Sequence, residues 1–200
     1  KERTGSLKEA ADLYRATIDG DPRYLVAIAR LGVVQAQVAV TSREGQDSAA
    51  AIAHLSKAVE LSPQEAILPY VLARFLMILG EETQLKLADE MFKKAGSLQV
   101  TPRNGNLPLW ADLGQACLAY ADEKRDSVDA RKLLNALLER IADKMAPGTP
   151  EQTRMEHEVY RAARIDLQII EDNDRKIDKV WDFTQFSAKP ADWNFDNVKS

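Results

Sequence analysis

Apolar residues recur at intervals of three and four along nearly the whole chain, the spacing of one buried face on a helix. No run alternates apolar and polar residues as a half-buried strand would. The spacing predicts helices over residues 6–19, 23–40, 48–61, 64–79, 83–97, 107–121, 127–144 and 150–179. Stretches rich in Gly, Pro, Asn and Asp separate them, and such short connections predict antiparallel neighbours stacked in sequence order. We therefore expect an all-α chain.

A second regularity is a small–large–small series of side chains on alternate predicted helices. Ala51, Leu55 and Ala58 form such a series, and Pro63 follows it. A small residue lets a neighbouring helix approach and a large one fills the space beyond it, so the series predicts a tightly packed face. The other series with the same offsets are Ala10, Tyr14, Thr17 and Pro22; Ala88, Phe92 and Ala95; and Ala130, Leu134 and Leu137, the last of which has a large residue at its third position.

The helices between these series carry a leucine followed by a small residue, at Leu31-Gly32, Leu72-Ala73 and Leu113-Gly114. These features resemble the tetratricopeptide repeat family. Its unit of about 34 residues has a large residue, Leu and Gly on its first helix, and Ala, an aromatic, Ala and a terminal Pro on its second. When Pro22 and Pro63 are each taken as the end of one unit, the next Leu–small pairs fall where the family has them. The alternative is an irregular helical bundle.

The resemblance covers about residues 6–145 and implies a right-handed solenoid of helical hairpins over residues 1–148. Its first unit would be partial, with only its second helix at 6–19, so the array is expected to continue upstream. Residues 149–180 would form a capping helix, with Thr149 as its N-cap and Pro150 at its first position. Relative to the family unit, residues 41–47 are an inserted loop, and Thr17 replaces an alanine.

Composition narrows the class of protein. The 200 residues have 45% hydrophobic and 29% charged side chains, which is typical of a folded protein, and a net charge of -4. This mildly acidic balance gives no case for a nucleic-acid partner, and no apolar run approaches the ~20 residues of a membrane-spanning helix. The single cysteine excludes an internal disulfide. It favours a cytoplasmic location over the alternative of an exported fragment, without fixing the compartment.

The residue types that usually carry chemistry are few and scattered. His54 and His157 are the only histidines, and neighbouring residues on a helix point in different directions, so Glu156-His157-Glu158 cannot form one metal site. Cys117 lies within an apolar helix, where a buried hydrophobic role is the common one. The segment 171–178 resembles part of a calcium loop but lacks its glycine and its final glutamate. We therefore expect no enzyme activity, no cofactor and no metal site.

In the tetratricopeptide family the first helices line a concave groove that holds the ligand. Carried over to this sequence, the resemblance implies a groove formed by Val26, Val33, Gln37, Ile67, Tyr70, Arg74, Met77, Ile78, Gln115 and Leu118. The set is mostly apolar, and Arg74 is nearly alone as a cation, so a clamp for a terminal carboxylate is disfavoured. An amphipathic helix or an extended apolar segment of another protein is the expected ligand. The alternative is that some of these residues are core between helices.

The final segment, residues 181–200, holds an unusual share of the aromatic side chains. Aromatic residues are stabilised by burial, so this tail is expected to dock through Trp181, Phe183, Phe186, Trp193 and Phe195. It would cap its own last repeats or occupy a groove, in the same molecule or in a neighbouring copy, which would give a homo-oligomer. Together these features predict a scaffold or adaptor that binds a protein or peptide. The alternative is the structural or regulatory repeat region of a larger enzyme or exported multi-protein complex.

Overall fold

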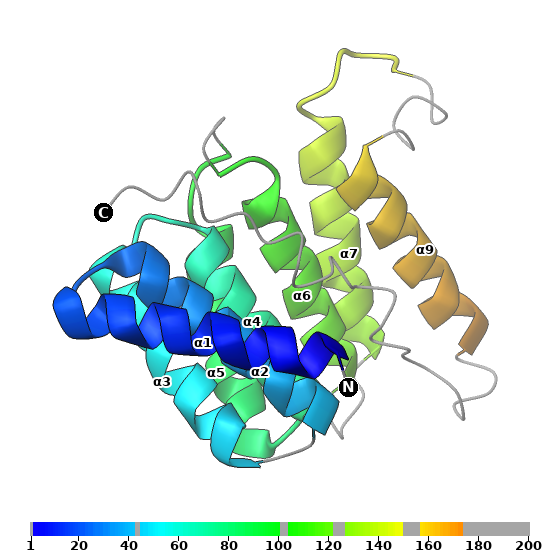
Figure 1. The fold of residues 1–200 in the computed structure, drawn as a ribbon. Helices are drawn as coiled ribbons and strands as arrows, with labels where there is room; N and C mark the ends of the chain where they lie inside the picture. Colours follow the sequence, from blue (N-terminus) through cyan, green and yellow to red (C-terminus); the bar gives the residue numbers. More distant parts are fainter. Residues whose placement is uncertain (1, 43–44, 101–103, 122–126, 150–156, 174–200) are drawn as a thin grey trace.

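A computed structural model describes residues 2–42, 45–100, 104–121, 127–149 and 157–173, and all regular structure within these ranges is helical (Figure 1). The helices are α1 (Glu2–Gly20), α2 (Leu25–Ser42), α3 (Gly45–Leu61), α4 (Ile67–Leu79), α5 (Glu82–Gly96), α6 (Leu107–Ala121), α7 (Ser127–Ala142) and α9 (Glu158–Asn173). The prediction of an all-α chain is thus confirmed for the part of the chain that the structure describes. From α1 to α7, each helix end lies within four residues of its predicted position.

Two predicted boundaries differ from the structure. The loop predicted at 41–47 is too long, since α2 continues to Ser42 and α3 starts at Gly45, and this segment has no proline to end a helix early. The capping helix predicted over 150–179 is wrong at residue 157, because α9 begins at Glu158. His157 explains this start: its Nδ1 accepts a hydrogen bond from the N–H of Tyr160 at 3.4 Å, as an N-cap side chain does. The rest of that prediction, at 150–156 and 174–179, lies outside the described residues.

The helices stack in the order in which they occur in the chain. The most extensive contacts join α2 to α3, α4 to α5 and α6 to α7, which makes three helical hairpins. Contacts from α3 to α4 and from α5 to α6 join successive hairpins, and α9 packs against α7. Smaller contacts join α2 to α4, α4 to α6 and α6 to α9, so these four helices form a row, called the helix row below. Figure 1 shows the progression across the molecule, from the blue and cyan helices on one side to the orange α9 on the other.

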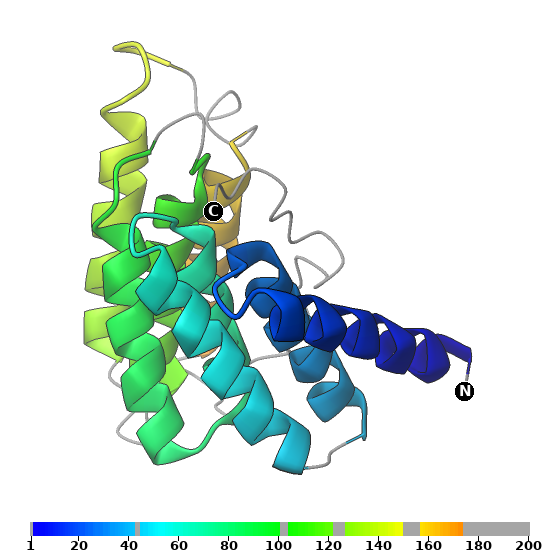
Figure 2. The ribbon, with the colours of Figure 1, turned by 60° about the vertical axis from the view of Figure 1, so that its left-hand side comes forward.

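The core lies between the paired helices, where the small–large–small series come together. In α3, α5 and α7 every member of these series is buried: Ala51, Leu55, Ala58, Ala88, Phe92, Ala95, Ala130, Leu134 and Leu137. The equivalent residues of α1 are less covered, since Ala10 and Tyr14 are half-buried and Thr17 is exposed. Figure 2 shows the cause, because α1 packs on α2 and then projects away from the other helices towards its N-terminus.

Two glycines of the helix row lie where a neighbouring helix comes very close. A Cβ at Gly32 in α2 would be 2.8 Å from Cγ of Leu55 in α3, and a Cβ at Gly114 in α6 would be 2.5 Å from the ring of Phe92 in α5. A larger residue at either position would collide with a buried side chain in a close-packed interior. The Leu-Gly pairs therefore mark the points where helices of the row touch the helices beside them.

Candidate functional site

The predicted groove residues lie on α2, α4 and α6, three members of the helix row, but they differ widely in exposure. Ile78 is the most open, with 44% of its surface exposed. The half-buried members are Val26, Gln37, Ile67 and Gln115. The buried members are Val33, Tyr70, Arg74, Met77 and Leu118. Half of the predicted set therefore has little surface to offer a ligand.

The buried apolar members belong to the core between helices. Val33, Tyr70, Met77 and Leu118 are part of one hydrophobic cluster that runs through all three hairpins. Tyr70 meets Phe92 edge-on, with the ring centroids 6.1 Å apart and the ring planes at 60°. For these four residues the structure agrees with the alternative of inter-helix core.

Tyr70 and Arg74 form a buried polar pair on α4. The Nη1 of Arg74 donates a hydrogen bond to the hydroxyl of Tyr70 at 2.9 Å, and the guanidinium carbon lies 5.8 Å from the centre of the Tyr70 ring. Burial raises the pKa of Tyr70, and the neighbouring Arg74 charge opposes this rise. The phenol is therefore a neutral acceptor that holds the guanidinium in one position on the helix row.

A second polar group on the helix row is Asp166 of α9. It lies close enough to Cys117 of α6 for its negative charge to raise the pKa of the thiol. Burial raises the pKa of the Cys117 thiol well above its usual range, and the negative charge of Asp166 raises it further, while Arg74 lowers it. Asp166 is only 8% exposed, and its Oδ2 has no hydrogen-bond partner within the described residues. Burial raises the pKa of Asp166 to about 7. Cys117 is therefore an unreactive neutral thiol, and the surroundings of Asp166 disfavour its ionised form.

Sequence reasoning missed Asp166, although a signal for it was present. On α9 the buried residues Val159, Ala163 and Ile170 are spaced as one helical face, and position 166 falls within the same face. An acidic residue on an otherwise apolar face is the informative exception, because charged side chains are rarely buried without a partner.

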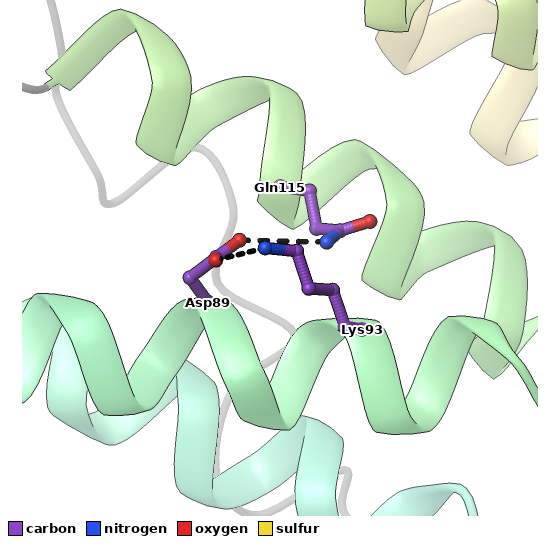
Figure 3. A network of polar contacts seen from close by, with 3 residues as sticks. All are labelled: Asp89, Lys93 and Gln115. Atoms are coloured by element: carbon purple, nitrogen blue, oxygen red, sulfur yellow. Dashed lines mark hydrogen bonds and ion pairs between the residues drawn. The ribbon is translucent and has the colours of Figure 1, made fainter.

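Gln115 is placed against α5 instead of lying free on the helix row. Its Nε2 donates to Oδ1 of Asp89 at 3.4 Å, and the other carboxylate oxygen of Asp89 pairs with Lys93 (Figure 3). The network joins α5 to α6, so the amide of Gln115 already has a partner inside the protein. Gln115 therefore offers less to a ligand than the groove prediction assumed.

Asp112 and Arg140 make a further link between helices. Arg140 Nη2 of α7 lies 2.5 Å from Oδ2 of Asp112 of α6. Burial raises the pKa of Asp112 to about 6, and Arg140 limits the rise. This ion pair joins α6 to α7.

A shallow pocket of about 190 Å³ lies between α1 and α2, and sequence reasoning did not find it. Its lining residues are Lys8, Ala11, Asp12, Arg15, Val34, Gln35 and Val38. Arg15 Nη1 donates to Asp12 Oδ1 at 2.6 Å, and the buried Gln35 has an Oε1 without a hydrogen-bond partner within the described residues. Small-molecule sites usually have volumes of roughly 300 Å³ or more, so this pocket is too small for a typical ligand.

The remaining candidates have local roles or fall outside the described residues. His54 Nδ1 lies 2.9 Å from the carbonyl oxygen of Ala50, one turn earlier in α3, and His157 caps α9. Within the described ranges, His, Cys, Asp and Glu side chains do not gather in groups of three that would hold a metal ion. None of the helices described combines the length and apolar character needed to cross a membrane. The predicted tail contacts at Trp181, Phe183, Phe186, Trp193 and Phe195 lie outside the described residues.

Comparison of the chain with protein-family models, with curated proteins and with solved structures finds no match.

Proposed function

We propose that this chain is a tetratricopeptide-like solenoid that acts as a scaffold or adaptor, binding a peptide or helix of another protein along the helix row. The register of the hairpins supports the proposal. The Leu–small pairs recur on α2, α4 and α6, at the same place in three successive hairpins. Their packing is not equivalent, because Gly32 meets Leu55 of its own hairpin and Gly114 meets Phe92 of the preceding one, so the support comes from the positions of the pairs along the helices. Hairpins repeated in register present one helix from each pair on a continuous surface.

The observation that carries the binding role is a contrast in exposure between apolar residues of α2 and α4. The half-buried or exposed residues Val26, Ile67 and Ile78 are called the rim below, and the buried residues Val33 and Met77 are called the floor. On α2 and α4, Val26 and Ile67 are half-buried and Ile78 is 44% exposed, while Val33 and Met77 beside them belong to the core. The packed floor is already ordered, so a ligand meets little ordering cost on the protein side. The rim offers apolar area to bury, as the apolar face of an amphipathic helix requires.

A matched pair of surface substitutions tests this role. Ile78→Asp places a charge on the rim, and Leu133→Asp makes the same change on α7, outside the helix row, at a residue of similar exposure (39%). Random peptides displayed on phage are selected against the wild-type chain, and the Kd of the selected peptides is measured by fluorescence anisotropy. We expect Leu133→Asp to bind like the wild type, and Ile78→Asp to raise Kd at least about tenfold, which is about 1.4 kcal/mol.

The controls separate binding from folding. Both variants should retain the helical circular dichroism and the urea midpoint of the wild type, since both residues lie at the surface. If no peptide is selected, or if the two substitutions affect Kd equally, the ligand does not lie on the helix row and the proposed function fails.

A further inference from the structure

The two ends of the stack of helices are complementary. In the first two hairpins the second helix, α3 or α5, packs on the first helix of its own hairpin and on the first helix of the next one. The helix α1 packs on α2 as α3 packs on α4, and α9 packs on α7 and α6 as α6 packs on α5 and α4. Among the described residues, α1 therefore lacks the extensive packing of a first helix, and α9 lacks that of a second helix.

The packing face of α1 is left partly open by this arrangement. Ala10 and Tyr14 of its small–large–small series are half-buried, and Thr17 is exposed. The equivalent residues of α3, α5 and α7, which each have a first helix beside them, are all buried. Figure 2 shows α1 projecting from the other helices. The comparison indicates that a further helix belongs against this face of α1.

Leu13 marks the open side of α1. It is 70% exposed, the highest value among the large apolar side chains of the described residues. It precedes Thr17 by one turn, so the two residues lie on the same side of the helix. Leu133, at the equivalent position of α7, is 39% exposed, and Met91 of α5 is half-buried and packs against the core. Leu13 therefore lacks cover that its equivalents have.

An apolar side chain is also uncovered on α9, at the other end of the stack. Ile165 is 46% exposed, and Ala162, three residues earlier on the same side, is half-buried. The buried residues Val159, Ala163 and Ile170 belong to the core cluster shared with α6 and α7. The side of α9 that carries Ile165 is therefore available to a second helix.

We propose that the chain associates head to tail with a second copy of itself, with α9 of one copy packing beside α1 of the next as the two helices of a hairpin. A second copy is selected because the contact continues the packing of α2 with α3, α4 with α5 and α6 with α7. It also covers both open ends at once, and brings Leu13 against Ile165. The inference goes beyond the proposed binding role and does not depend on it.

The exposed charges agree with the antiparallel orientation that a hairpin requires. The C-terminal half of α1 exposes one more anion than cation, in Asp12, Arg15 and Asp19. The N-terminal half of α9 exposes one more cation than anion, in Glu158, Arg161 and Arg164. An antiparallel pair places these two halves together, and opposite charges across a contact favour one orientation over the other.

Two variants that each block one end test the inference. Leu13→Asp places a charge on the α1 end, and Ile165→Asp places one on the α9 end. Association is measured by sedimentation velocity at up to about 0.1 mM protein, and we expect the wild type to form dimers and larger species. Each variant alone should raise Kd at least about tenfold, because one of the two surfaces is lost at every contact. Their equimolar mixture should form dimers and nothing larger, because one intact α1 end meets one intact α9 end.

The controls separate association from folding. Val128→Asp on α7, a residue with a similar exposed fraction of 66%, should associate like the wild type. All three variants should keep the helical circular dichroism and the urea midpoint of the wild type, since the residues lie at the surface. If an aspartate variant unfolds more easily, Leu13→Ser and Ile165→Ser remove the apolar contact without adding a charge and take its place in the mixing experiment.

The remaining outcomes overturn the inference. A wild type that stays monomeric at the highest concentration does so directly. Dimers of Ile165→Asp alone would mean that α1 of one copy binds α1 of another, and dimers of Leu13→Asp alone would mean the same for α9. In either case two identical surfaces meet, and the association is not head to tail. A mixture that stays monomeric while the wild type associates would place the contact elsewhere on the chain.

Discussion

The stability of the chain should depend on pH through Asp166, and Asp166→Asn should remove that dependence. The pKa of Asp166 in the folded chain is about 7, above its ordinary value of 3.8. Between these values the folded chain keeps a proton that the unfolded chain has lost. The free energy of unfolding must therefore fall as the pH rises from about 4 to about 7, and this contribution is constant above and below that window.

The size of the effect follows from the same two pKa values. Their difference, at about 1.4 kcal/mol per pH unit, corresponds to about 4 kcal/mol between the two ends of the window. Solvent screens little of this, since only 8% of Asp166 is exposed. Asparagine cannot ionise and resembles the neutral acid. The two proteins should therefore be similarly stable at low pH, and Asp166→Asn should be the more stable by up to about 4 kcal/mol at high pH.

Urea unfolding at several pH values, followed by far-UV circular dichroism, measures this difference. Asp112, whose pKa burial raises to about 6, adds a pH dependence of the same sign. It does so in both proteins, so it cancels when the two free energies are subtracted. A difference that stays constant across the pH range would refute the reasoning, because Asp166 would then not change its protonation within the window. A wild type that is more stable than the variant at high pH would show that Asp166 has a cationic partner in solution.

Three further substitutions follow from the packing. Gly114→Ala should lower the free energy of unfolding by roughly 1–3 kcal/mol, because its Cβ meets the Phe92 ring. Gly20→Ala, with open space around it, should change the free energy little or raise it, and equal effects in urea unfolding would contradict the close approach at Gly114. Tyr70→Phe should cost about 1–2 kcal/mol, because Arg74 loses a buried acceptor; an unchanged urea midpoint would argue against this.

Much of the fold could be predicted because its determinants are local in the sequence. The spacing of apolar residues fixes which face of a helix is buried, and turn residues mark where helices end. The close approaches between helices could also be predicted from the sequence. A glycine inside a helix is costly, so its presence indicates that a neighbouring group occupies the space of a side chain. Gly32 against Leu55 is such a case. The start of α9 could not be predicted from the sequence, because it depends on a hydrogen bond from the N–H of Tyr160 to the side chain of His157.

The exposure of the groove residues could not be predicted, because a stacked helix has more than one buried face. An apolar residue on α4 can face its partner α5, the adjacent helices of the row, or solvent, and periodicity does not distinguish these. Tyr70 and Met77 are buried, whereas Ile78, next in the chain, is exposed. The partner of the polar residue Gln115 could not be predicted either, because its hydrogen bond to Asp89 depends on how α5 and α6 pack.

Substitutions in the buried floor should lower the free energy of unfolding, whereas substitutions in the exposed rim should affect binding alone. The proposed binding role must therefore be tested at the rim. Tyr70→Ala combined with Met77→Ala removes two core side chains, and each such change costs roughly 2–5 kcal/mol. Their sum is comparable with the 5–15 kcal/mol, roughly, that stabilises an ordinary domain, so lost binding by this double variant would report unfolding. Ile78→Asp alters the surface and leaves the core intact. Lost binding with an unchanged free energy of unfolding would therefore place the ligand on the helix row, and unchanged binding would place it elsewhere.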